Sequence, residues 1–282
     1  MYQFPIGVML ESFRLPTDQA IKQAAAIGAQ GIQMYATKGE HAPENMTAQM
    51  RRDLLAQLKD NGLVFSALCG DLGKGFGNPE LNPDLIEKSK RILDLAKDME
   101  CDIVTTHVGV VPTDPGHPRY AIMQDACGQL AEYADSLDAH FAIETGPETS
   151  AVLKGFLDGL GSRGVAVNLD PANLVMVTGD DPVQAVYTLR DYIVHTHAKD
   201  GVKLLDRDPE IIYGVRDIED VIAEGKAFEE VPLGQGGVSF PAYLAALEDI
   251  GFRGYLTIER EVGADPSKDI ALAANFLRNL MR

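Results

Sequence analysis

Tyr192-Ile-Val-His-Thr-His-Ala-Lys-Asp200 is a short apolar run that ends in two histidines and a Lys-Asp pair. Side chains alternate between the two faces of a strand, so we expect His195, His197 and Lys199 to share one face. The stretch predicts a buried strand that carries polar, metal-binding side chain types at its C-terminal end.

Three other stretches end in the same manner, each with a carboxylate after an apolar run. They are Phe141-Ala-Ile-Glu144, Val165-Ala-Val-Asn-Leu-Asp170 and Tyr255-Leu-Thr-Ile-Glu259. If the four strands are parallel and belong to one sheet, their C-terminal ends lie on the same side. The pattern therefore predicts that these polar ends meet at one common mouth.

Strands and helices are expected to alternate along the whole chain. Strict alternation implies parallel pairing, and eight repeats favour closure into a (β/α)8 barrel. An open doubly wound sheet is the main rival, but it usually carries a glycine fingerprint after the first strand, whereas Gly7 is isolated. We predict an α/β fold, a single TIM-barrel domain over residues 1–282. The expected strands are 6–10, 31–35, 63–68, 102–107, 141–144, 165–170, 192–200 and 254–259, and the expected helices are 17–27, 47–61, 83–99, 120–137, 148–160, 182–192, 239–250 and 267–280.

Two segments depart from this alternation. Residues 201–232 are charged, have a poor apolar pattern and exceed the usual length of a loop, which predicts either a lid over the mouth or a surface insertion. Residues 70–77 are rich in glycine but lack the Lys-Ser/Thr ending of a phosphate-binding loop, which favours a mobile loop.

Charge and composition limit the partners of the protein. Lysine and arginine number 25 against 42 acidic residues, and the net charge of −17 repels phosphate backbones, so no nucleic-acid partner is expected. The chain has three cysteines, an odd number without close pairing, which is typical of a protein in the reducing cytoplasm. With neither a signal peptide nor an apolar run of about 20 residues, we expect a cytoplasmic protein without membrane association. Assembly into a homo-oligomer is left open.

Three carboxylates and one imidazole at the expected strand ends predict a site for one divalent cation such as Mn²⁺, Mg²⁺, Co²⁺ or Zn²⁺. The four residues are Glu144, Asp170, His197 and Glu259. Without a cation, three carboxylates in one cavity would repel one another and raise at least one pKa. Each residue also has a structural interpretation, Asp170 as a helix cap and His197 as a hydrogen-bonded barrel histidine. For His195, one pleat deeper, an interior hydrogen-bonded role is favoured over ligation.

The remaining histidines divide by position. His107 ends an expected strand and, with Asn173, is expected to line the mouth. The other three are expected to be structural or on the surface, namely His41, His117 and His140.

Five motifs make the sequence resemble the xylose-isomerase-like barrel superfamily, in particular its sugar phosphate isomerase/epimerase branch. The resemblance covers nearly the whole chain and is carried by Ile143-Glu144-Thr-Gly146, Leu169-Asp170-Pro-Ala-Asn173, His197-Ala-Lys-Asp200, Pro232-Leu-Gly-Gln-Gly236 and Thr257-Ile-Glu259-Arg-Glu261.

The resemblance implies that the predicted ligand quartet holds the metal and that Glu144 and Glu259 act as catalytic acid and base. Two departures stand out, Asn173 where many epimerases have a histidine and Gln33 where a strand-two glutamate is usual. An asparagine can bond a hydroxyl group but cannot titrate, which leaves that epimerase contact open. The expected substrate-binding residues are His107, Asn173, Lys199 and Arg260.

The chemistry predicted from this site is metal-dependent proton abstraction from a sugar or sugar phosphate through a metal-stabilised enediolate. Isomerisation, epimerisation and an inosose-dehydratase-like elimination share this first step, so the sequence does not choose among them. A nuclease like endonuclease IV would need more histidines at strand ends and a basic face. A barrel that binds its ligand without turnover is the other alternative.

Overall fold

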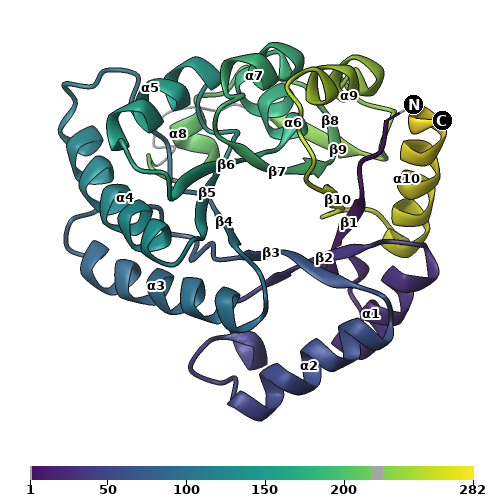
Figure 1. The fold of residues 1–282 in the computed structure, drawn as a ribbon. Helices are drawn as coiled ribbons and strands as arrows, with labels where there is room; N and C mark the ends of the chain where they lie inside the picture. The colour runs from purple at the N-terminus through teal and green to yellow at the C-terminus, as the bar shows by residue number, and fades with distance from the viewer. Residues whose placement is uncertain (1, 217–224) are drawn as a thin grey trace.

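Eight parallel strands close into a barrel in the computed structural model, which describes residues 2–216 and 225–282 (Figure 1). The strand order is β1-β10-β7-β6-β5-β4-β3-β2, and β1 closes the ring by pairing with both β10 and β2. The predicted TIM barrel is therefore confirmed. The barrel strands are β1 (Ile6–Met9), β2 (Gly31–Tyr35), β3 (Val64–Cys69), β4 (Ile103–Thr106), β5 (His140–Glu144), β6 (Val165–Leu169), β7 (Ile193–Ala198) and β10 (Leu256–Ile258).

Helices surround the barrel because each connection between strands packs an apolar face against the sheet (Figure 1). In α3, for example, Leu85, Ile92 and Ala96 face inward and are buried. The outer helices are α1 (Thr17–Ala26), α2 (Ala48–Asp60), α3 (Asn82–Asp98), α4 (Pro118–Ser136), α5 (Ser150–Leu160), α7 (Pro182–Thr188), α9 (Phe240–Asp249) and α10 (Pro266–Met281). The two ends of the chain lie side by side, since the Tyr2 amide donates to the Met281 carbonyl at 3.1 Å.

One predicted strand is divided in the structure. Residues 192–200 were expected to form a single strand, but β7 ends at Ala198 and a second strand, β8 (Asp200–Lys203), begins two residues later. β8 pairs antiparallel with β9 (Phe228–Val231) outside the barrel, and α8 (Pro209–Ile212) lies between them in the chain. The expected insertion at 201–232 thus has secondary structure of its own, and its central residues 217–224 lie outside the described residues.

The break after β7 is explained by the buried carboxylate of Asp200. It accepts hydrogen bonds from the backbone N–H groups of Gly201, Gly234 and Gly236 at 2.9 Å each and of Val238 at 3.1 Å. A Cβ on Gly236 would lie 2.2 Å from Asp200 Oδ1, so only glycine fits there. The Asp200 and Pro232–Gly236 motifs are therefore two halves of one structural feature.

We expect replacement of Asp200 by alanine to lower the free energy of unfolding by about 3 kcal/mol or more, because hydrogen bonds to a charged group contribute roughly 1.5–3 kcal/mol each. Urea denaturation measures this change. Asp206→Ala is the matched control, since the Asp206 side chain is 95% exposed and pairs with Lys203 on the surface. Equal unfolding midpoints for the two variants would contradict the structural role of Asp200.

Candidate metal centre

Four side chains from four barrel strands converge at the C-terminal mouth. Glu144 ends β5, Asp170 follows β6, His197 lies in β7 and Glu259 follows β10. Their ligand atoms all lie within 4.8 Å of one another, and each residue is at most 8% exposed. His197 Nδ1 lies 3.3 Å from Asp170 Oδ2, 3.4 Å from Glu259 Oε2 and 3.6 Å from Glu144 Oε1. The structure thus brings together all four residues that the sequence analysis grouped.

The loops after β5 and β6 lock together and orient two of these carboxylates. Thr145 Oγ1 accepts from the Asp170 amide at 2.8 Å and donates to the Asp170 carbonyl at 3.0 Å. Gly146 has a φ of +148°, and a Cβ there would lie 2.7 Å from the Cβ of Asn173. This close approach explains the glycine of the Glu144-Thr-Gly motif.

Asp170 forms the helix cap that its position suggested, and it also faces the other candidate ligands. Its Oδ1 accepts from the Asn173 amide at 2.9 Å and so caps the short helix α6 (Pro171–Asn173), which continues into the π-helical turn η3 (Leu174–Thr178). Its Oδ2 faces His197. The cap fixes the carboxylate so that one oxygen remains directed at the cluster.

Burial and mutual charge set the protonation of the cluster. Burial raises the pKa of Glu144, and the neighbouring carboxylates of Glu259 and Asp170 raise it further. His107 and His197 lower this pKa, but the net shift is upward. In Glu259 the effect of burial is outweighed by Lys199 and His197, which hold its pKa below the usual value. Burial alone would lower the pKa of His197, but Glu259 and Glu144 raise it to about 9.

This donor set fits a single divalent cation. Three carboxylates and one imidazole provide the oxygen and nitrogen ligands that Mn²⁺, Mg²⁺, Co²⁺ and Zn²⁺ accept, and a cation offsets the carboxylate repulsion. The side chains that could hold it are Glu144, Asp170, His197 and Glu259. Among residues 2–216 and 225–282, no other group of three or more such side chains converges in this manner.

A cavity of about 930 Å³ opens above the cluster, and Glu144 and Glu259 form part of its wall. All four expected substrate-binding residues also line it, namely His107, Asn173, Lys199 and Arg260. The side-chain Nδ2 of Asn173 donates to Glu144 Oε1 at 3.1 Å. This contact leaves the side-chain Oδ1 of Asn173 as the atom that could accept a hydrogen bond from a substrate hydroxyl.

The two cationic residues that were expected to bind substrate, Lys199 and Arg260, are already paired. Lys199 Nζ donates to Glu259 Oε2 at 2.9 Å and to Glu261 Oε2 at 2.5 Å. The Arg260 guanidinium lies between Glu230 at 2.6 Å and Asp269 at 2.9 Å. Lys199 therefore contacts the candidate metal ligand Glu259 directly, whereas Arg260 mainly links β9 and α10 to the end of β10.

Sequence reasoning missed Asp71, which orients His107. The Asp71 carboxylate lies 3.3 Å from His107 Nδ1, and the Tyr213 ring packs against the imidazole at 5.8 Å between centroids. Burial of His107 would lower its pKa, but Glu144 and Asp71 raise it to about 9. The signal was present, because Asp71 follows β3 as the other polar residues follow their strands. Its loop, expected to be mobile, is anchored by Phe76, which is 3% exposed.

His195 has the interior role that was expected. Its Nδ1 lies 2.9 Å from Asn168 Oδ1 and its Nε2 lies 2.9 Å from Thr257 Oγ1. Burial, together with His197, holds its pKa well below the ordinary value, so the ring is neutral. It takes no place in the ligand quartet.

The three remaining histidines lie away from the cluster. His117 caps α4 by accepting from the Arg119 amide at 3.1 Å. His140 is the first residue of β5, at the opposite end of the strand from Glu144, and His41 ends a short 3₁₀ turn, η2 (Gly39–His41). None of these side chains reaches the ligand quartet.

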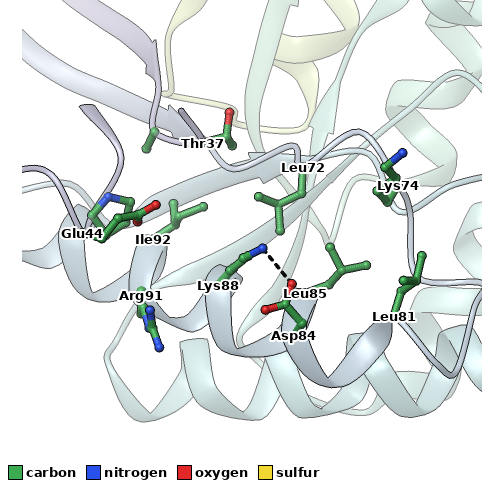
Figure 2. Close-up of a pocket in the computed structure, with 12 residues that line it drawn as sticks. Thr37, Glu44, Leu72, Lys74, Leu81, Asp84, Leu85, Lys88, Arg91 and Ile92 are labelled. Atoms are coloured by element: carbon green, nitrogen blue, oxygen red, sulfur yellow. Dashed lines mark ion pairs between the residues drawn. The ribbon is translucent and has the colours of Figure 1, made fainter. Parts of the chain in front are cut away.

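A second pocket of about 410 Å³ lies between α3 and the loops after β2 and β3. Figure 2 shows Lys88 turned toward Asp84, with which it pairs at 2.7 Å, and Arg91 pointing away from the pocket. The cations of this pocket do not converge on a common point, and none of the four candidate ligands lines it. The cavity above the quartet is therefore the candidate active site.

Comparison with known proteins identifies the class of this barrel. Residues 21–280 match the family of xylose isomerase-like TIM barrels, and the chain belongs to that family. A xylose isomerase domain protein from Planctomyces limnophilus has the same fold, with a TM-score of 0.79 and 25% identity, over 98% of this chain and 96% of that one. The family match and this structure agree on a xylose isomerase-like TIM barrel.

More distant structures share the fold. A probable 3-DHS dehydratase, AsbF, from Bacillus anthracis superposes with a TM-score of 0.76 at 19% identity, over 98% of this chain and 99% of that one. D-psicose 3-epimerase superposes with a TM-score of 0.74 at 16% identity, over 99% of each chain.

A curated relative covers only part of the chain. The Rhizobium meliloti rhizopine catabolism protein MocC is 29% identical over 163 residues, which are 57% of this chain and 47% of the relative. The chain thus spans about half the length of this relative.

Among the described residues, no helix has the length and apolar character to cross a bilayer.

Glu148 provides a pH-dependent test of the buried loop between β5 and α5. It is buried in the β5–α5 loop with Oε2 3.3 Å from the Val111 amide, and burial raises its pKa from 4.5 to about 8. The folded state therefore keeps a proton that the unfolded state loses between pH 4.5 and 8. This stabilisation is complete below pH 4.5 and disappears as pH rises through 8, at up to about 1.4 kcal/mol per pH unit.

We expect Glu148→Gln to remove this contribution, so that the variant gains stability relative to wild type as pH rises from 5 to 9. Urea unfolding at several pH values measures the difference. A constant difference between the two proteins across this range would show that Glu148 titrates normally.

Proposed function

We propose that the protein is a divalent-metal-dependent isomerase or epimerase of a small-molecule sugar or sugar phosphate. One observation carries the proposal: four candidate ligands converge beside a cavity of about 930 Å³ that Glu144 and Glu259 line. The four residues are Glu144, Asp170, His197 and Glu259. Membership of the xylose isomerase-like family supports it, as does the epimerase activity in the name of a structural neighbour.

The metal site is proposed to be the full quartet. When bound, a divalent cation supplies a Lewis acid that withdraws electron density from a substrate carbonyl and its neighbouring hydroxyl. The four protein ligands come from different strands of a rigid barrel, so their positions are set before any substrate arrives.

Purified protein is expected to contain about one divalent metal per chain, and His197→Ala should lose it, because the carboxylates then lack the nitrogen ligand and repel one another. Elemental analysis after gel filtration measures the metal content. His140→Ala, a histidine at the opposite end of the barrel, is the matched control and should keep the metal. Undiminished metal in the His197→Ala protein would remove His197 from the proposed site.

The proton transfers are assigned to Glu144 and Glu259. They come from β5 and β10, which are separated in the barrel by β6 and β7, so their carboxylates approach the cluster from different directions. A carboxylate on one side of the substrate removes the α-proton, and an acid or water on the other side returns one. Return to the neighbouring carbon gives isomerisation, and return to the opposite face of the same carbon gives epimerisation.

Glutamine at position 144 or 259 keeps the size of the side chain but cannot take up a proton at neutral pH. We expect either variant to lose about 10²–10⁴-fold in deuterium incorporation at the α-carbon of a ketose or ketose phosphate in D₂O. NMR of the recovered sugar measures exchange before any product is formed.

Metal content is measured in parallel, and Glu148→Gln serves as the control, since this buried glutamate does not line the cavity. A metal-loaded Glu259→Gln protein that exchanges at the wild-type rate would exclude Glu259 as the base. Absence of exchange in the metal-loaded wild type across a panel of sugars would favour a binding barrel without turnover.

A dehydratase is the second candidate function. The fold similarity to the probable 3-DHS dehydratase supports it. Elimination of a β-hydroxyl group begins with the same proton removal, so the two candidates differ in the product and not in the first step. A new unsaturated product, detected by its ultraviolet absorbance, distinguishes the lyase from the isomerase.

The insertion is proposed to act as a wall or lid of the substrate cavity. Its described parts contribute Ile211, Ile212, Tyr213 and Phe228 to the lining, and Glu210 forms an ion pair with Arg119 of α4. His107, Asn173, Lys199 and Arg260 are likewise proposed to contact the substrate.

The cytoplasmic location, the lack of a nucleic-acid partner and the oligomeric state stay predictions.

A further inference from the structure

Gln33 lies inside the barrel beneath the candidate metal ligands. It belongs to β2, is fully buried and does not line the cavity. Its side-chain Nε2 donates to Thr105 Oγ1 at 2.9 Å, and its Oε1 lies 3.0 Å from His197 Nε2. The residue therefore contacts the imidazole on the side opposite to the three carboxylates.

The hydrogen-bond directions around Asn168 follow from Glu144, whose carboxylate accepts. Asn168 Nδ2 donates to Glu144 Oε2 at 3.0 Å, so its Oδ1 accepts from His195 Nδ1. His195 Nε2 then accepts from the Thr257 hydroxyl. These contacts place the side-chain Nδ2 of Asn168, and not its Oδ1, 3.2 Å from His197 Nε2. An amide nitrogen only donates, so Asn168 cannot accept a hydrogen bond from His197 Nε2–H.

Gln33 Oε1 is then the acceptor within reach of His197 Nε2. A carbonyl oxygen at 3.0 Å stabilises the form of the ring that carries hydrogen on Nε2. Nδ1, which lies 3.3–3.6 Å from the three carboxylates, is the nitrogen left to bind a cation. The partner of a metal-binding histidine generally sets its tautomer and orientation in this manner.

We propose that Gln33 is a positioning residue for the metal site. By accepting from His197 Nε2–H, it holds the imidazole with Nδ1 presented to the cation between Glu144, Asp170 and Glu259. The proposal rests on the proposed function, because it assumes that the quartet binds a metal.

Isothermal titration of metal-free protein with Mn²⁺ tests this role without any activity assay. Gln33→Leu keeps similar bulk but removes the acceptor, so the dissociation constant should rise about 10–100-fold. Gln33→Glu keeps an acceptor oxygen and should bind at least as tightly as wild type. This rescue separates the hydrogen bond from simple loss of packing.

Ser66→Ala is the matched control on the neighbouring strand β3. Its hydroxyl is buried and has no hydrogen-bond partner among the described residues, so its loss should leave the dissociation constant unchanged. Thr105→Val, an isosteric change, releases the Gln33 amide from its anchor and should also weaken binding. It keeps the test decisive if Gln33→Leu fails to fold.

The outcomes separate the two proposals. A wild-type protein that does not bind Mn²⁺ would overturn the metal site itself. A wild-type protein that binds Mn²⁺, together with unchanged affinity in the folded Gln33→Leu or Thr105→Val protein, would overturn the role of Gln33 alone. Loss of affinity in Gln33→Glu equal to that in Gln33→Leu would also overturn it.

Discussion

Three buried carboxylates held against one imidazole impose the constraint on which the mouth of this barrel depends. Glu144, Asp170 and Glu259 repel one another, and the cationic side chains of His107, His197 and Lys199 offset this repulsion. The barrel keeps them in place because each carboxylate ends or follows a strand whose own register is fixed by two neighbours. Such an arrangement is costly for folding alone, and this cost supports the proposal of a cation site at this end of the barrel.

Beneath the quartet, uncharged polar side chains align its members. Asn168 bridges Glu144 and His195, and Gln33 links His197 to Thr105. These residues do not line the cavity, and their hydrogen bonds reach the side chains that do or that lie beside it. The site is therefore built in two layers, a charged layer open to substrate and an amide layer buried below.

The sequence was sufficient to predict the barrel and the convergence of the four side chains of the candidate metal site, because both depend on local patterns repeated at regular spacing. It was insufficient where distant backbone decides the geometry. Nothing local to Asp200 indicated that its carboxylate would bind the 234–238 loop and end β7 at Ala198. The Asp71–His107 contact and the burial of Glu148 likewise depend on loops that meet only in three dimensions.

The most direct test of the central claim is a crystal structure of the protein soaked in Mn²⁺, with anomalous diffraction recorded to locate the ion. We expect one strong anomalous peak at the barrel mouth, about 2.0–2.3 Å from His197 Nδ1 and from oxygens of Glu144, Asp170 and Glu259. An anomalous peak elsewhere, or a quartet that stays empty at saturating Mn²⁺, would contradict the account.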